Sequence, residues 1–439
     1  MLTESYLAAT SGPPLANNTA IAKDAGIYEH TLHPSYSTSA VLKKSSASTN
    51  SLGVSDTHIF AAQEDKSTVH VYSRAKGNQE TLATFPERIR SLVLLDDVVI
   101  LGTQEGRLIV WEICTGRQIT TPASHVQAIT CVAATPYHVV SGSDDSNIHV
   151  WSLSRLLQLE KTIEHEPQET LSNHRAAITS LALGQSVNPD TNICVSASKD
   201  RSCVIWNYQL GIALRTLLFP SSPLCLSLDP CARAFYVASE DGSLHAIELF
   251  SEKALIGHQS TEDRSTAVQV SSPFATVPQE AGPASCLGLN HDGTILLSGH
   301  PRGQVLRWDL SNRADSTEVA NLNASITNIA FVSPFPSSRG TKPVTVLKPF
   351  LGSTSYNFTS QMDADLVEES RFDKMVSSKG IPDDVLEKAI LAFEEPASDI
   401  VGNAELQKEN EELWEIINEQ RALQHKTLQR YVEAKSAKA

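Results

Sequence analysis

The sequence predicts an all-β fold, a closed seven-bladed β-propeller, with a C-terminal α-helical extension. Three features predict it. A short alternating apolar run, closing on an aromatic residue in most copies, recurs along the chain, and several copies follow a tight-turn signal. Some thirty residues near the end combine strong helix formers with no proline or glycine after Gly402. The 439 residues, 41% of them hydrophobic, can form a sizeable core.

The apolar runs mark repeat units of similar length. They read VHVY, LIVW, IHVW, CVIW, LHAI and VLRW, with a weaker copy, GIYE, and their landmark residues are Tyr28, Tyr72, Trp111, Trp151, Trp206, Ile247 and Trp308. The steps between landmarks are 44, 39, 40, 55, 41 and 61 residues. Most lie near the roughly 40–45 residues of a four-stranded propeller blade, so the two long steps indicate insertions.

A turn signal lies about six residues before several landmarks. The segments SGSDDSN, SASKDRS and ASEDGS place Asp145, Asp200 and Asp241 at these turns. A tight turn that leads into an alternating strand is typical of a β-hairpin. Each unit is therefore expected to fold as antiparallel strands.

These residues resemble the WD-repeat family, roughly over residues 1–335. In that family a His, a Ser or Thr, a turn Asp and a strand Trp form a buried hydrogen-bonded set. The resemblance assigns two such structural tetrads, His125, Ser141, Asp145 and Trp151, and His174, Ser196, Asp200 and Trp206. Other units depart from the pattern at Glu105, Arg302 and Ile247, and we expect plain apolar packing to hold those blades.

The propeller is expected to span residues 1–335. Its first repeat unit lacks an opening strand. The segment SITNIAFVSP (residues 325–334) has the pattern of a strand but follows the last complete repeat unit. We therefore expect residues 325–334 to pair with the N-terminal blade and close the ring, which would remove exposed sheet edges.

Three segments between the repeats have other compositions. Residues 153–174 contain apolar side chains that could face one side of a short helix: Leu156, Leu157, Leu159 and Ile163. Residues 258–282 are polar and proline-bearing, which predicts a long exposed loop whose ordering on binding stays open. Serine-rich residues 35–51 read as a solvated connector between blades. Residues 336–400 are expected to form an irregular connector with one short helix, in IPDDVLEKAILAF.

Residues 401–435 are expected to form an amphipathic, coiled-coil-like helix. A heptad with Leu413 at position a gives a short seam with polar interruptions and a broader apolar face beside it. The predicted partner-binding residues are Leu406, Leu413, Trp414, Ile416, Ile417, Leu423 and Leu428. Because an isolated helix gains most of its stability by burying its apolar face, this helix should dock on its own propeller, on a second copy or on another subunit.

Charge and cysteine usage restrict the classes of partner. The formal net charge is −15, of which −8 lies in residues 361–439, so a basic protein surface is favoured and direct binding of naked nucleic acid is not expected. Seven cysteines without a C-x-x-C pair argue for a reducing, intracellular compartment and against a zinc cluster. The start lacks a secretory signal and no stretch is apolar enough to span a bilayer, which predicts a soluble protein without membrane association.

The sequence shows no motif that indicates an enzyme. It has no phosphate-binding loop, no H-E-x-x-H and no G-x-S-x-G, so no catalytic, cofactor-binding or metal-binding residues are expected. His125, Ser141 and Asp145 superficially match a catalytic triad, but an equivalent trio recurs in the next unit, which is typical of a scaffold motif.

The start MLTESYLAATS and the tail ELQKENEELWEIINEQ, taken with the propeller, resemble the fungal WD-repeat subunit of the pre-rRNA-processing complex. The resemblance implies a nuclear scaffold, nucleolar or nucleoplasmic, that acts in removal of the second internal transcribed spacer and in maturation of the pre-60S particle. Implied partners are the scaffold subunits of that complex, the pre-60S particle and, through the complex, an AAA-type remodelling ATPase. Two alternatives stay open, a substrate receptor or signalling scaffold unrelated to ribosomes, and an enzyme that uses the central channel.

Overall fold

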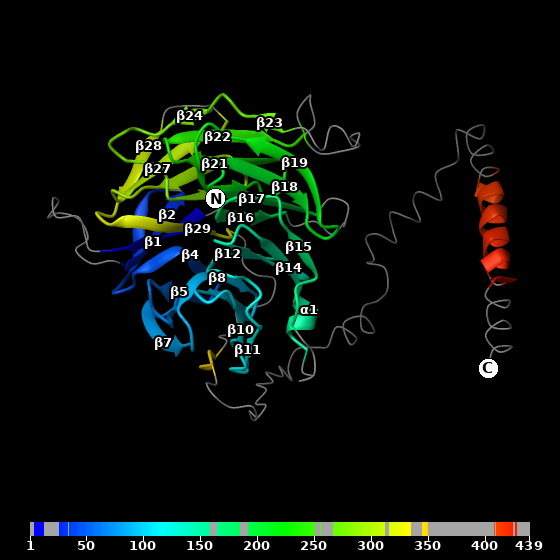
Figure 1. The fold of residues 1–439 in the computed structure, drawn as a ribbon, viewed down its shortest axis with the longest axis horizontal. Coiled ribbons are helices and arrows are strands. Elements are labelled where there is room, and N and C mark those ends of the chain that lie inside the picture. The colour runs from blue at the N-terminus through cyan, green and yellow to red at the C-terminus, as the bar shows by residue number, and fades with distance from the viewer. Residues whose placement is uncertain are drawn as a thin grey trace, which may run out of the picture. The chain divides into compact units, whose positions relative to one another are not determined.

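The computed structural model describes residues 4–12, 26–33, 35–158, 165–184, 192–250, 255, 267–311, 316–334, 345–349, 408, 410–424 and 426–427. Its sheets confirm the predicted seven-bladed propeller, since six four-stranded sheets and one five-stranded sheet follow one another around a ring (Figure 1). We number the blades 1 to 7 in chain order. The landmark residue lies on the third strand of every blade, where it packs between neighbouring sheets.

The strand bounds follow the repeat. Blade 1 has β29 (Ser325–Val332), β1 (Glu4–Ser11), β2 (Gly26–His33) and β3 (Ser37–Lys43); blade 2 has β4 (Ala47–Val54), β5 (His58–Gln63), β6 (Thr68–Ser73) and β7 (Asn78–Thr84); blade 3 has β8 (Ile89–Leu95), β9 (Val98–Thr103), β10 (Leu108–Glu112) and β11 (Gln118–Thr120). Blade 4 has β12 (Ile129–Ala134), β13 (His138–Ser143), β14 (Ile148–Ser152) and β15 (Glu169–Leu171). Blade 5 has β16 (Ile178–Leu183), β17 (Ile193–Ser198), β18 (Ser202–Asn207) and β19 (Ile212–Leu218). Blade 6 has β20 (Pro223–Leu228), β21 (Ala234–Ser239), β22 (Ser243–Glu248) and β24 (Ala275–Thr276), and blade 7 has β25 (Cys286–Leu289), β26 (Ile295–Gly299), β27 (Gln304–Asp309) and β28 (Thr317–Asn321).

The two ends of the repeat region meet in blade 1. β29 pairs antiparallel with β1 from Ser5↔Val332 to Ser11↔Ser325, with one register shift, and Figure 1 shows the two strands side by side. An aromatic row crosses β29, β1 and β2 and ends at Tyr36, just before β3, since Phe331, Tyr6, His30 and Tyr36 have successive ring centroids 6.1, 5.1 and 5.5 Å apart. The first strand of the ring is thus supplied by the end of the repeat region.

Two segments expected to be irregular form strands. The serine-rich stretch contains β3 and the start of β4, so its interpretation as a connector is wrong. β3 is the outermost strand of blade 1 and most of its side chains are exposed, which explains its polar composition. In residues 258–282, the described part is not only an exposed loop, because it contributes β23 (Val268–Gln269), which pairs parallel to β19, and the outer strand of blade 6, β24.

The helices are few in the described residues. α1 (Leu153–Leu156) is a single turn within the first insertion, with Leu156 buried, and Leu157 follows it, whereas Leu159 and Ile163 lie outside the described residues. Residues 410–424 form the predicted C-terminal helix. The short helix expected within 336–400 lies outside the described residues. No described helix is long and apolar enough to cross a membrane.

Candidate functional site

The tetrad of blade 4 forms a continuous chain of hydrogen bonds. The indole N–H of Trp151 donates to Ser141 Oγ over 3.0 Å, Ser141 Oγ lies 2.9 Å from His125 Nε2, and His125 Nδ1 lies 3.1 Å from Asp145 Oδ2. At these distances the imidazole bonds the serine hydroxyl through Nε2 and the carboxylate through Nδ1. The chain therefore ties the loop before β12 to the second and third strands of its blade.

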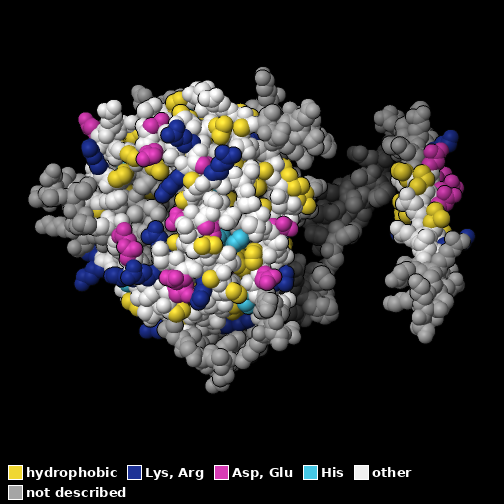
Figure 2. All heavy atoms as spheres, in the orientation of Figure 1, with side chains coloured by type: hydrophobic (Ala, Val, Ile, Leu, Met, Phe, Trp, Pro, Cys, Tyr) yellow, Lys and Arg dark blue, Asp and Glu magenta, His cyan; other side chains and the backbone are white. Residues whose placement is uncertain are grey.

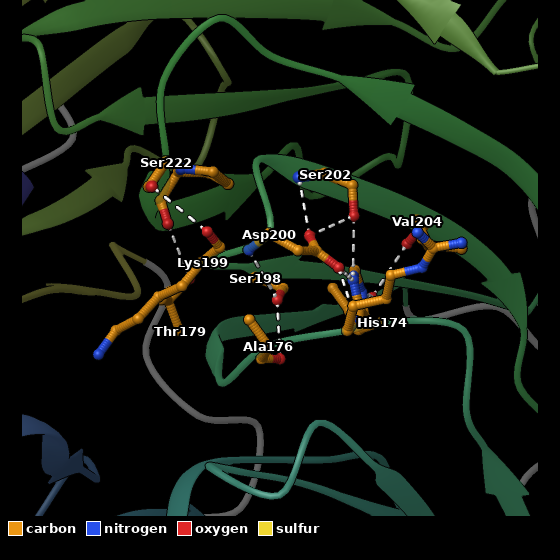
Figure 3. A network of polar contacts seen from close by, with 12 residues as sticks. His174, Ala176, Thr179, Ser198, Lys199, Asp200, Ser202, Val204 and Ser222 are labelled. Atoms are coloured by element: carbon orange, nitrogen blue, oxygen red, sulfur yellow. Dashed lines mark hydrogen bonds and ion pairs between the residues drawn. The ribbon is translucent and has the colours of Figure 1, made fainter.

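Blade 5 repeats this arrangement (Figure 3). Trp206 donates to Ser196 Oγ over 2.8 Å, Ser196 Oγ lies 2.7 Å from His174 Nε2, and His174 Nδ1 lies 3.2 Å from Asp200 Oδ2. Figure 3 shows the Asp200 carboxylate pointing toward both His174 and Ser202, and its Oδ1 accepts the Ser202 backbone N–H over 2.9 Å. Asp200 thus shapes the β17–β18 turn with one oxygen and holds the histidine loop with the other.

Both turn carboxyls stay ionised in the folded state. Burial alone would raise the pKa of Asp145, but hydrogen bonds from His125 and from backbone N–H groups, including that of Val126, outweigh it and lower the pKa to about 2. The pKa of Asp200 is lowered further, because bonds from His174 and Ser202 again outweigh the effect of burial. The two carboxylates therefore hold their loops throughout the neutral range.

The tetrads are built as structural joints. Ser141 and Ser196 are fully buried, and each hydroxyl is occupied by an indole N–H and an imidazole nitrogen. A serine nucleophile needs an accessible hydroxyl beside its base, which neither blade provides. The geometry thus favours the scaffold interpretation of both sets.

Blade 7 carries a variant of the tetrad that sequence reasoning missed. Trp308 donates to Ser298 Oγ over 2.9 Å, and Ser298 Oγ lies 2.8 Å from His300 Nε2, but the histidine sits two residues after the serine and its Nδ1 lies 2.9 Å from the Gly282 carbonyl oxygen. The signal in the sequence was the segment SGH before the turn. This blade departs from the family pattern at the turn, where Arg302 stands in place of aspartate.

Blade 3 lacks the serine and the turn aspartate, and blade 6 lacks the serine and the tryptophan. At the serine position blade 6 has Val237, which belongs to the same apolar cluster as Ile247. Blade 3 has Leu101, buried in one cluster with Trp111. Apolar packing therefore replaces the hydrogen-bonded chain in these two blades.

A cavity of about 420 Å³ lies on the propeller axis, lined by the innermost strands of all seven blades. A wide bulge in β4 enters it, since Ala47 pairs with Gln63 but Leu52 with Ala61. At the tip of the bulge, Asn50 adopts a φ of 55°, and its side-chain amide donates to the carbonyl oxygens of Thr130 and Thr179 over 3.3 and 3.2 Å. The bulge thus bridges blades 2, 4 and 5 across the axis.

The lining of this cavity offers little to a chemical reaction. Burial raises the pKa of Cys286 to about 12 and that of Cys225 well above its usual value, so both thiols remain protonated and poorly nucleophilic. Its charged residues, Arg90, Asp144 and Lys199, belong to different blades. All seven cysteines are free thiols, and no cluster of three or more metal-ligating side chains occurs among the described residues.

The C-terminal helix exposes the apolar face that the heptad predicts. Leu413, Trp414, Ile416, Ile417 and Leu423 are exposed by between 40 and 63%. Figure 2 shows apolar side chains along one side of this helix and acidic side chains along another. Leu406 and Leu428 lie outside the described residues, and the partner-binding role of all seven residues stays a prediction.

Comparison with known proteins gives consistent findings. The family model "WD domain, G-beta repeat" matches residues 116–152 and 165–207, which are largely blades 4 and 5. The pre-rRNA-processing protein IPI3 of Yarrowia lipolytica is 24% identical over 82% of this chain and 88% of its own length, and WD repeat-containing protein 18 of Danio rerio is 27% identical over 64% of each chain. Pre-rRNA-processing protein crb3/ipi3 of Schizosaccharomyces pombe is 24% identical over 65% of this chain and 69% of its own.

Among solved structures, the crystal structure of the computationally designed Ika8 protein is similar with a TM-score of 0.51, covering 74% of this chain and 89% of that one at 19% identity. This likeness concerns the fold alone. The chain is therefore a seven-bladed β-propeller with WD repeats matched over residues 116–152 and 165–207, and it is similar to the fungal pre-rRNA-processing proteins.

Proposed function

We propose that the protein is a non-catalytic scaffold subunit of a nuclear complex needed for pre-rRNA processing, specifically for removal of the second internal transcribed spacer and for maturation of the large ribosomal subunit. The observation that carries this proposal is the similarity to a pre-rRNA-processing protein across 82% of this chain and 88% of that one. Fully occupied tetrad hydroxyls and protonated channel thiols support a role without catalysis.

In this proposal the propeller and the helix have separate tasks. The closed ring is a rigid platform, and the face seen in Figure 2 mixes basic and acidic side chains, as suits contacts with several protein partners. The helix is the assembly element, because its exposed apolar face has most to gain from burial. Its occupant is a scaffold subunit of the complex or a second copy of this chain.

The chain would reach the pre-60S particle, and an AAA-type remodelling ATPase, through this complex in the nucleolus or nucleoplasm. The net charge of −15 fits basic ribosomal proteins and assembly factors better than bare rRNA. Association should therefore be slower at higher salt, because charge complementarity acts mainly on encounter.

Mass spectrometry of proteins that co-purify with the tagged full-length chain tests the proposal, beside a chain that ends at Gly402. We expect large-subunit assembly factors and the ATPase with the full chain, and their depletion with the shorter one. Recovery of cullin or kinase subunits instead would support a substrate receptor or signalling scaffold and contradict the ribosomal role.

The helix face is tested by replacing Ile416 and Leu423 together by Asp. Two carboxylates in an apolar interface are costly to desolvate, so recovery of the complex should fall at least tenfold. The matched control replaces Asn418 and Ala422 by Asp, which adds the same charge at positions about 100–160° around the helix from Ile416 and Leu423, given about 100° per residue. Equal recovery of both variants would show that the interface lies elsewhere.

A further inference from the structure

The tryptophan of blade 3 finds its hydrogen-bond acceptor far away in the sequence. In blades 4, 5 and 7 the indole N–H donates to a serine of the same blade, but in blade 3 that position is Leu101, which offers no acceptor. The Trp111 side chain is fully buried, and its N–H donates instead to the carbonyl oxygen of Leu347 over 3.1 Å. Without Leu347 a buried donor would be left unsatisfied, which proteins rarely tolerate.

The contact is reciprocal and involves the main chain. The backbone N–H of Leu347 donates to the carbonyl oxygen of Ile113 over 2.9 Å, so both peptide groups flanking this residue are bonded to the same stretch of blade 3. One main-chain bond and one side-chain bond therefore hold the segment beside the end of β10. Recognition of extended peptides likewise combines main-chain bonds, which give affinity, with side-chain contacts, which give specificity.

Apolar contacts surround these two bonds. Val346 packs against the cluster shared by blades 2 and 3, in which Phe60 and Phe85 meet the Trp111 ring edge-on at centroid distances of 6.0 and 5.8 Å. Pro349 is also buried, whereas Thr345 and Lys348 are exposed. The segment therefore presents its apolar side chains to the blade and its polar ones to solvent.

We propose that blade 3 contains a binding site for an extended apolar peptide and that its ligand is residues 345–349 of the same chain, which form a clamp. The clamp supplies the acceptor that Leu101 cannot provide. β29 ends at Val332 in blade 1, whereas the clamp attaches the chain to blade 3, two positions around the ring. The last contact of the chain with the propeller among the described residues is therefore at blade 3. The clamp itself does not depend on the proposed function.

The test uses the full-length chain with ¹⁵N-labelled tryptophan, which gives one indole signal for each of five residues. Val346→Asp places a carboxylate against the apolar cluster and should release the clamp. We expect the Trp111 indole N–H to shift and to exchange with solvent at least tenfold faster, while the signals of Trp151, Trp206 and Trp308 keep their positions. Thr345→Asp, which adds the same charge at the exposed neighbouring residue, should leave all five signals unchanged.

Trp111→Phe assigns the signal and is the second variant. It retains an aromatic ring but removes the donor, so the Leu347 amide, observed with additional ¹⁵N-leucine labelling, should exchange faster in a chain whose other three propeller tryptophans report a native fold. Unchanged exchange of Trp111 in Val346→Asp, or of Leu347 in Trp111→Phe, would overturn the clamp. Because neither readout involves a partner, failure here is distinguishable from failure of the proposed function.

Discussion

At the scale of single residues, the side chain on the second strand decides where the indole N–H of each propeller tryptophan finds its hydrogen-bond acceptor. Ser141, Ser196 and Ser298 keep the indole bond within the blade, whereas Leu101 leaves it to a residue of the C-terminal region. Substitutions that look like simple loss of a repeat motif can therefore create a new contact. The turn aspartates show the same dependence on context.

Asp200 and Asp241 allow the histidine contact to be measured separately from the turn. Both accept the backbone N–H and the hydroxyl of the serine two residues later, but only Asp200 also binds His174 and the backbone N–H of Arg175. Asp200→Ala should lower the free energy of unfolding by about 3 kcal/mol more than Asp241→Ala, because two charge-assisted bonds are lost.

Urea unfolding followed by tryptophan fluorescence measures both variants under the same conditions. Asp241→Ala is the matched control, since it removes the same turn bonds in the neighbouring blade. If the two variants were destabilised equally, the bond to His174 would contribute nothing to stability.

At the scale of elements, sequence patterns predicted the third strands and missed the outer ones. The third strands are buried along almost their whole length and carry compact apolar runs that close on a large side chain, as in β14 and β18. β3 is exposed over most of its length and β24 has two residues, so neither has enough apolar side chains to produce a pattern. An outer strand is specified mainly by the backbone edge that its neighbour offers.

The contacts that sequence reasoning could not find join residues far apart in the chain. The two tetrads came from a family resemblance, and each lies within one repeat. The clamp joins Trp111 to a residue 236 positions later, and the β4 bulge bonds Asn50 to Thr179 across the axis. No local periodicity encodes such pairs, since they depend on the ring being closed.

Ring closure by β29 gives a prediction for a whole element. Deleting residues 325–334 would expose the edge of β1 and remove the bonds that Thr327 and Asn328 make to the carbonyl oxygens of Ala47 and Ser48, at 2.8 and 2.7 Å. We expect the whole propeller to unfold at much lower urea concentration and to aggregate.

Two point substitutions in blade 1 make this test specific. Ile326→Asp buries a carboxylate in the innermost strand and should cost more than about 4 kcal/mol, whereas Val41→Asp, in the outermost strand and 40% exposed, should cost less than about 1 kcal/mol. A deletion variant that unfolds at the native midpoint would show that the ring does not depend on β29.

At the scale of the whole molecule, buried and half-buried histidines couple the stability of the propeller to pH. The pKa is lowered, in each case chiefly by burial, for seven of them: His30, His70, His138, His149, His165, His245 and His300. These residues are neutral in the fold but become protonated near pH 6.5 once the chain unfolds. Since the unfolded chain then binds more protons, stability is complete above pH 6.5 and falls as the pH decreases.

His30 and His149 should dominate this loss, because burial lowers the pKa of each to about 4 and both side chains are almost fully buried. Each should contribute a loss of about 3 kcal/mol between pH 6.5 and pH 4. Below that range, protonation of Asp145 and Asp200 should weaken the two tetrads as well, since their folded-state pKa values lie below the usual aspartate value. The free energy of unfolding, measured in urea at several pH values from 7.5 to 4, reports the sum of the histidine contributions.

His30→Gln separates one histidine from the general effect of charge. The variant loses some stability at pH 7.5, but it cannot take up the proton, so its free energy of unfolding should fall less steeply between pH 6.5 and 4 than that of the native chain. Changes in surface charge affect both proteins alike and cancel in the comparison. Parallel pH curves would mean that His30 is not held neutral by its place between Tyr6 and Tyr36, and that the acid sensitivity of the ring has another origin.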